Sequence, residues 1–134
     1  MYCVDASVII SAARLIEPYS ERSKAFLDGI RAKHSKVFLP EILLLEVAAA
    51  LIRATKDARF SFQFSRSLRR IEYFSFVPID SRLTDSALKI IVDTGLRGPD
   101  AIYVALAVEY GLTLITLDEE QTEKGKKFAN VQKP

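Results

Sequence analysis

Four acidic residues stand in local settings where a carboxylate could support chemistry. Asp5 follows the apolar segment MYCV, and Glu46 interrupts the apolar run LPEILLLEVAAAL. Asp100 follows a Gly-Pro pair in RGPDAIYVALAVEYG, and Asp118 follows the apolar segment LTLITL. A lone carboxylate among apolar side chains is costly to desolvate unless it is paired, protonated or bound to a cation. The surroundings of Glu46 therefore predict a cationic partner or a group of acids that share one.

The elements that must position these acids alternate between strand and helix along the chain. Apolar runs and turn residues predict strands over 1–4, 36–40, 74–80, 112–118 and 129–133, and helices over 6–15, 20–33, 39–51, 60–74, 81–95, 98–111 and 119–128. This alternation indicates a parallel sheet of four to five strands with helices on both faces. The length of 134 residues predicts a single domain over 1–134.

This topology predicts that the four acids meet. In right-handed crossovers each helix begins at the edge where the strands end, which is also where open α/β folds bind ligands. Asp5 and Asp118 follow strands, and Asp100 lies in the first turn of its helix. Glu46 lies about 9 Å into its helix, at 1.5 Å per residue, with a long side chain that tilts back toward the helix start.

Four neighbouring carboxylates would repel one another strongly, and no buried basic partner is evident from the sequence. One histidine and one cysteine cannot build a soft metal site. All-oxygen ligands favour Mg²⁺ or Mn²⁺, whose bound water can attack a phosphodiester. Each acid alone has a plainer interpretation: Asp5, Asp100 and Asp118 as residues of helix N-termini, with Ser7 better placed than Asp5 to cap, and Glu46 as half of a salt bridge.

Composition restricts the partners. Nineteen Lys and Arg against seventeen Asp and Glu give a net charge of +2, so any nucleic-acid site must be a local patch. Arg14 and Arg97 are the candidate RNA-binding cations near the acidic edge. No apolar run approaches the length of a membrane span, and no secretion signal is recognisable. We therefore expect a cytoplasmic protein without a membrane partner.

The four acidic segments resemble the four acidic positions of the PIN-domain family, in order and over essentially the whole chain. The resemblance is strongest to the small VapC-type toxins of VapBC toxin–antitoxin pairs. It implies a three-layer α/β/α sandwich, Mg²⁺- or Mn²⁺-dependent endoribonuclease activity, homodimers and an inhibitory antitoxin. Asp5, Glu46, Asp100 and Asp118 would then be the catalytic, metal-binding residues. Ser7 and Thr116 match supporting polar positions, although a helix cap and an exposed strand residue describe them equally well.

Other classes fit less well. A phosphatase of the haloacid dehalogenase type needs a second Asp two residues after the first, where this chain has Ser7. A receiver domain needs a lysine near the end of a late strand, and TLITLDEE supplies none there. A PIN-like RNA-binding or scaffold subunit without catalytic activity remains the alternative.

Aromatic residues predict an association surface. In the helix predicted over 60–74, a core-facing stripe of Phe60, Phe64, Leu68 and Ile71 would leave Phe62 and Tyr73 on other faces. Exposed aromatic residues are typical of partner surfaces. We expect a homodimer, with the region of about 42–74 also receiving an antitoxin segment.

Overall fold

The computed structural model, described here for residues 1–14 and 18–134, is built on a five-stranded sheet. All neighbouring strands are parallel, in the order β3-β2-β1-β4-β5. The strands are β1 (Tyr2–Val4), β2 (Val37–Pro40), β3 (Phe74–Val77), β4 (Thr113–Ile115) and β5 (Asn130–Gln132). The predicted parallel sheet is confirmed, although β3 and β4 end earlier than the sequence predicts.

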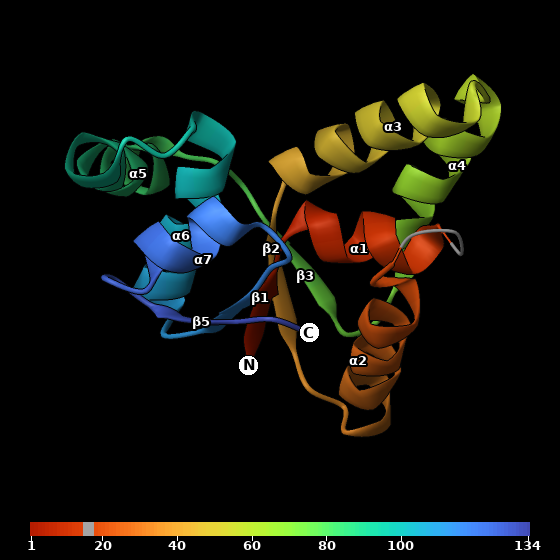
Figure 1. Cartoon of the computed structure of the whole chain (residues 1–134), viewed down its shortest axis with the longest axis horizontal. Coiled ribbons are helices and arrows are strands. Elements are labelled where there is room, and N and C mark those ends of the chain that lie inside the picture. Colours follow the sequence, from red (N-terminus) through yellow and green to blue (C-terminus); the bar gives the residue numbers. More distant parts are fainter. Residues whose placement is uncertain (15–17) are drawn as a thin grey trace.

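Helices cover both faces of the sheet and make the three-layer arrangement that the sequence predicts. One face carries α1 (Ala6–Ala13), α2 (Ser20–Ala32), α3 (Ile42–Thr55) and α4 (Ala58–Ser67), and the other carries α5 (Ser81–Thr94), α6 (Gly98–Tyr110) and α7 (Glu119–Gly125) (Figure 1). A short 3₁₀ turn, Leu68–Arg70, follows α4. Within the described part of the chain, no helix has the length and apolar character that a membrane crossing requires.

Aspartates start four of the helices. Asp5, Asp57, Asp80 and Asp118 each accept a hydrogen bond from a backbone N–H in the first turn of the following helix, at 2.7–2.9 Å. Such caps satisfy N–H groups that have no partner inside the helix. The prediction that Ser7 is better placed than Asp5 to cap α1 is wrong, because Ser7 lies inside the helix and donates its own N–H to Asp5.

The central helix is α6, which is buried along most of its length as its apolar sequence predicts. Tyr103, Val104 and Leu106 are fully buried, and Asp100 at its first turn is 8% exposed. Gly111, with a φ of +62°, ends the helix in the left-handed conformation that glycine adopts without strain. This buried helix fixes where Asp100 stands relative to the sheet.

The face of α4 differs from the predicted one. Phe60 is 42% exposed, whereas Ser61 and Ser65 are buried and Leu68 follows them toward the core. The hydroxyls of both serines donate to backbone carbonyls of the preceding turn, so these small residues are buried without unpaired oxygens. Phe64 and Ile71 are half-buried against the core.

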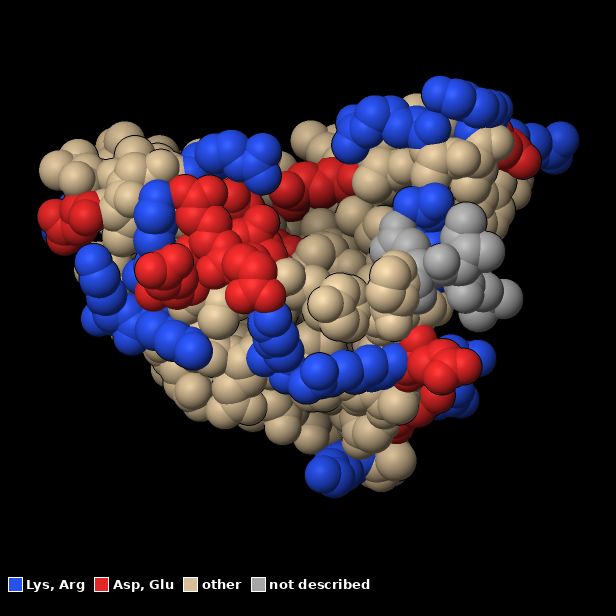
Figure 2. Space-filling view, in the orientation of Figure 1, with Lys and Arg blue, Asp and Glu red and all other residues tan. Residues whose placement is uncertain are grey.

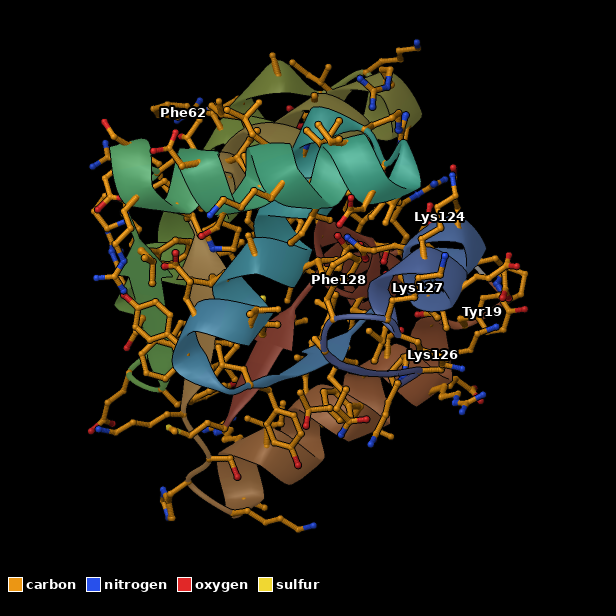
Figure 3. All side chains as sticks on the ribbon, turned by 90° about the vertical axis from the view of Figure 1, so that its left-hand side faces the viewer. Tyr19, Phe62, Lys124, Lys126, Lys127 and Phe128 are labelled. Carbon is orange, nitrogen blue, oxygen red and sulfur yellow. The ribbon has the colours of Figure 1, made fainter. Side chains whose placement is uncertain are left out.

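The two aromatic residues predicted to remain exposed differ from each other. Phe62 is 62% exposed and lies at the upper left of the view in Figure 3, away from the labelled residues Lys124, Lys126 and Lys127 on the right. Tyr73 lies beyond the helix and is half-buried. Its ring packs edge-on against the ring of Phe74, with 5.0 Å between the ring centroids. The prediction is confirmed for Phe62 and wrong for Tyr73, because the helical segment ends before Tyr73.

Candidate active site

The four predicted acids line one open pocket of about 500 Å³. It lies where the strands end and where α3 and α6 begin, and it gathers residues from distant parts of the chain. Figure 2 shows the red surface of the acidic residues beside a hollow between the two helical layers. The lining residues are Asp5, Ala6, Ser7, Ile10, Ile42, Leu45, Glu46, Ala49, Ala50, Arg53, Arg97, Asp100 and Asp118.

Asp5 and Asp118 are held as caps of the helices that follow them. One oxygen of Asp5 accepts from the N–H of Ser7 at 2.9 Å, and one oxygen of Asp118 accepts from the N–H of Gln121 at 2.7 Å. The plainer interpretation of both residues as helix caps is therefore correct as far as it goes. Since both carboxylates also line the pocket, the cap fixes the orientation of each one there.

Glu46 is held by a tyrosine from the opposite helical layer. The hydroxyl of Tyr103 on α6 donates to Glu46 Oε2 at 2.6 Å, across 57 residues of sequence. Glu46 is half-buried rather than enclosed, because one side of α3 faces solvent and its neighbour Leu45 is 70% exposed. The interpretation that apolar side chains surround Glu46 is therefore wrong. The prediction that Glu46 meets the other acids agrees with the pocket that all four residues line.

Asp100 has a basic partner that the sequence interpretation left out. The Nε of Arg97 lies 3.3 Å from Asp100 Oδ2, three residues away, and both residues line the pocket. The Arg97 side chain is 79% exposed, so the pair lies at the rim of the pocket. An exposed ion pair is weak, since water screens it. Arg97 thus reduces the repulsion in the pocket without neutralising it.

Burial and mutual repulsion disfavour the charged forms of three of these acids. Burial raises the pKa of the Asp5 carboxyl, and the charge of Asp118 adds to this effect against the hydrogen bonds from Ser7. Burial likewise raises the pKa of Glu46, opposed by the Tyr103 hydrogen bond and reinforced by Asp5 and Asp100.

Asp100 follows the same pattern. Burial raises its pKa, the charge of Arg97 opposes the rise, and the charges of Asp5 and Asp118 add to it. The carboxylates therefore interact electrostatically with one another, and a bound cation would relieve the penalty on Asp5, Glu46 and Asp100.

The donor chemistry of the pocket suits a hard divalent cation, because all four acidic groups supply carboxylate oxygens. As the side chains stand, however, no three of the His, Cys, Asp and Glu residues in the described chain form a ready-made ligand group. One oxygen of each pocket acid is engaged with Ser7, Tyr103, Arg97 or Gln121. Metal binding would therefore require local side-chain rearrangement.

The other predicted site residues are placed less uniformly. Ser7 lines the pocket, and its Oγ accepts from the N–H of Leu117 at 3.1 Å, which ties α1 to the chain after β4. Thr116 is fully buried, so the alternative of an exposed strand residue is wrong. Its Oγ1 accepts a hydrogen bond from the N–H of Asp118 at 3.0 Å and so helps to position Asp118. Arg14, at the C-terminal end of α1, does not line the pocket.

Three residues near the acids were missed by the sequence analysis. Arg53 lines the pocket seven residues after Glu46, a spacing of two helical turns that returns to the same face. Tyr103 lies three residues after Asp100 on one face of α6. Gln121 is fully buried and donates from Nε2 to the backbone carbonyl of Asp100 at 3.2 Å. The spacing identifies the first two, whereas Gln121 carries no comparable signal.

Comparison with known sequences identifies the family. The sequence profile of the PIN domain matches residues 2–127 of this chain. The chain belongs to the PIN-domain family. A curated relative, exonuclease VapC9 of Pyrobaculum aerophilum, is 27% identical over 132 residues, which cover 98% of this chain and 90% of the relative.

Solved structures share the PIN-domain fold. VapC20 of Mycobacterium tuberculosis, described as a toxin that cleaves the sarcin-ricin loop, superposes with a TM-score of 0.80 at 15% identity and full coverage of both chains. A chain of VapBC2 from Rickettsia felis, bound to a DNA fragment from its promoter, gives a TM-score of 0.70 at 15% identity, covering 98% of this chain and 97% of the other. At these identities the likeness shows the fold.

Proposed function

We propose that this PIN-domain protein is a cytoplasmic, divalent-metal-dependent ribonuclease that hydrolyses RNA phosphodiester bonds, and that it is the toxin of a toxin–antitoxin pair. One observation carries the proposal: carboxylates from four separate parts of the chain line one open pocket, where burial and the neighbouring negative charges raise the pKa values of Asp5, Glu46 and Asp100. Acids that repel one another on a solvent-open surface reduce stability unless a cation compensates, and functional sites are where such groupings are concentrated.

In this proposal Asp5, Glu46, Asp100 and Asp118 hold Mg²⁺ or Mn²⁺. A bound metal ion of this kind supplies a water activated for attack and stabilises charge that develops on the phosphate. The chain's own part is positioning. The helix caps at Asp5 and Asp118 and the Tyr103 hydrogen bond to Glu46 restrict these carboxylates to orientations that face the pocket.

The names of relatives and of solved structures support an antitoxin partner. A curated relative is named an exonuclease, and several solved structures of the same fold are toxin–antitoxin complexes, some of them with DNA. We propose that this chain likewise binds an antitoxin, and that it forms a homodimer. Phe62, exposed on α4, is the residue that we place in a partner surface.

Internal cleavage of RNA is the cleavage mode that we propose, although the curated relative carries the name of an exonuclease. The pocket is an open hollow, not an enclosed cavity, and residues of α1, α3 and α6 line it. A strand can therefore cross it without threading an end. A circular RNA, which has no ends, distinguishes the two modes: an endoribonuclease linearises it and an exonuclease leaves it intact.

Two observations favour the alternative of an inactive RNA-binding or scaffold subunit. No three acids form a ready ligand group among the described residues, and Arg97 already pairs with Asp100. An inactive protein would bind RNA in the presence and absence of metal and would cleave none.

The deciding experiment incubates the purified protein with single-stranded RNA, with Mn²⁺ or Mg²⁺ and with EDTA. We expect cleavage with metal that EDTA abolishes. Glu46→Gln should lower the rate at least ~10²-fold, the scale on which loss of a transition-state stabiliser is felt. Glu41→Gln is the matched control, because Glu41 immediately precedes the same helix but pairs with Arg69 outside the pocket. Cleavage that survives EDTA, or equal losses in both variants, would contradict the proposal.

A further inference from the structure

The wall of the pocket away from the acids has a different chemical character. It consists of apolar and small side chains from α1 and α3, together with Arg53 from the last turn of α3; its residues are Ile10, Ile42, Leu45, Ala49, Ala50 and Arg53. The two alanines leave room beside the helix, and Leu45 is largely exposed. The pocket is therefore acidic at one end and apolar toward an arginine at the other.

Arg53 differs from the other arginine of the pocket. Arg97 pairs with Asp100, whereas no carboxylate among the described residues forms an ion pair with Arg53. Arg53 is exposed in the last turn of α3, and the nearest acid on its own helix, Glu46, is held by Tyr103. A guanidinium in this position has its fork of N–H donors available for an anionic ligand, and phosphate matches that geometry.

The segment that follows Arg53 is also positively charged. Residues 53–70 contain six Lys or Arg and a single Asp, a local net charge of +5 against +2 for the whole chain. Figure 2 shows Lys and Arg surface along the outer end of α3 and α4, next to the hollow that the acids border. This concentration of cations attracts a polyanion to the α3 side of the pocket.

We propose that the wall from Leu45 to Arg53 is the binding surface for the RNA strand next to the scissile bond, with Arg53 on a neighbouring phosphate. This inference rests on the proposed ribonuclease function and adds a residue that sets strand position. Seven residues separate Glu46 from Arg53, about 10 Å along the helix axis. That separation places the guanidinium on a phosphate other than the one at the carboxylates, and the apolar wall between them contacts a base or sugar.

Binding rather than cleavage tests this assignment. Fluorescence anisotropy measures the affinity of a fluorescein-labelled single-stranded RNA oligonucleotide at several NaCl concentrations, with Mn²⁺ present. All proteins in the series carry Glu46→Gln so that the RNA stays intact. Arg31→Ala is the matched control for Arg53→Ala, because Arg31 is also exposed in the last turn of a helix and lines a different pocket.

We expect Arg53→Ala to weaken binding about tenfold, the loss of one charge-assisted contact, and Arg31→Ala to leave it unchanged. The slope of log affinity against log salt should become less steep by about 0.7 for Arg53→Ala, the contribution of one phosphate contact on a single strand. Both exposed substitutions should leave the melting temperature unchanged, which excludes unfolding as the cause.

Three results would overturn the inference. Arg53→Ala could keep the parent's affinity and salt slope, or Arg31→Ala could lose as much as Arg53→Ala, which would mean general charge attraction. A labelled oligoglutamate peptide could bind the same wall as tightly as RNA and lose as much in Arg53→Ala, which would assign the wall to an acidic protein segment. These results are independent of the proposed function, which fails instead when the unsubstituted protein cleaves no RNA.

Discussion

Neutralising Asp100 should stabilise the metal-free protein even though Asp100 has an ion-pair partner. Asp100→Asn removes one negative charge from the pocket and keeps the side chain's shape and most of its hydrogen-bonding capacity. The residue is 8% exposed at the first turn of α6, and its pKa is raised by burial and by the charges of Asp5 and Asp118. The raised pKa means that the native state holds the charged form less favourably than the unfolded chain does.

The size of the effect follows from the opposing contributions. Losing the pair with Arg97 costs at most about 1 kcal/mol, because that side chain is 79% exposed and water screens the interaction. Relief of burial and repulsion exceeds this cost, since the net direction of the pKa change is upward despite Arg97. We expect a net gain on the order of 1 kcal/mol at neutral pH, or about 4 °C in melting temperature for a chain of this length.

Thermal melts of the parent and Asp100→Asn, each with EDTA and with Mn²⁺, measure the effect. In EDTA the variant should melt higher. With Mn²⁺ the difference should narrow or reverse, because metal that binds the native parent more tightly stabilises it in proportion to its affinity. RNA cleavage by the variant should fall at least ~10²-fold.

The pH dependence of the stability difference between the parent and Asp100→Asn tests whether repulsion is the cause. Because the native pKa of Asp100 is raised, the parent's disadvantage in EDTA appears as pH rises through and above the ordinary Asp value of about 3.9, and vanishes below it. A variant that is less stable in EDTA at neutral pH, with a deficit that disappears on acidification, would show that the Arg97 pair and the helix dipole outweigh the repulsion.

Three further predictions concern single contacts. Tyr103→Phe should cost about 1.5 kcal/mol in urea unfolding at neutral pH, because Glu46 loses a charge-assisted hydrogen bond; an unchanged midpoint would contradict the contact. Gly125→Ala should destabilise the protein by about 1 kcal/mol, because its Cβ would lie 3.2 Å from two valine methyl groups. Gly29→Ala, in open space within α2, should stabilise the protein by about 0.5–1 kcal/mol, and stability changes of the same sign in the two variants would refute this comparison. Phe62→Ser should weaken the proposed homodimer or antitoxin complex in analytical ultracentrifugation without changing the melting temperature; an unaffected assembly would remove Phe62 from the interface.

The sheet and the pocket could be predicted because their signals are periodic and topological. Short apolar runs alternated with helical segments, and the rule that helices begin where parallel strands end was sufficient to bring Asp5, Glu46, Asp100 and Asp118 to one pocket. Glycines 95 and 111 marked two helix ends correctly, because both adopt positive φ.

The details that failed depend on tertiary packing. The aromatic residues of α4 suggested a core stripe, but serines 61 and 65 face inward there, since their hydroxyls can bond to their own helix backbone. The contacts between the acids and their partners could not be predicted either, although spacing places Tyr103 on the same face of α6 as Asp100. Tyr103 reaches Glu46 from a helix that is 57 residues away in sequence, and that contact depends on how α3 and α6 pack across the sheet.

Calorimetric titration of the protein with Mn²⁺ measures whether the four carboxylates act as one metal site. We expect saturable binding by the parent and by Glu41→Gln, whose carboxylate lies outside the pocket. Binding should be at least about tenfold weaker in each of Asp5→Asn, Glu46→Gln, Asp100→Asn and Asp118→Asn, the effect of losing about 1.4 kcal/mol at one ligand. Mn²⁺ affinity that is unchanged in these four variants, or absent from the parent, would contradict a shared metal site.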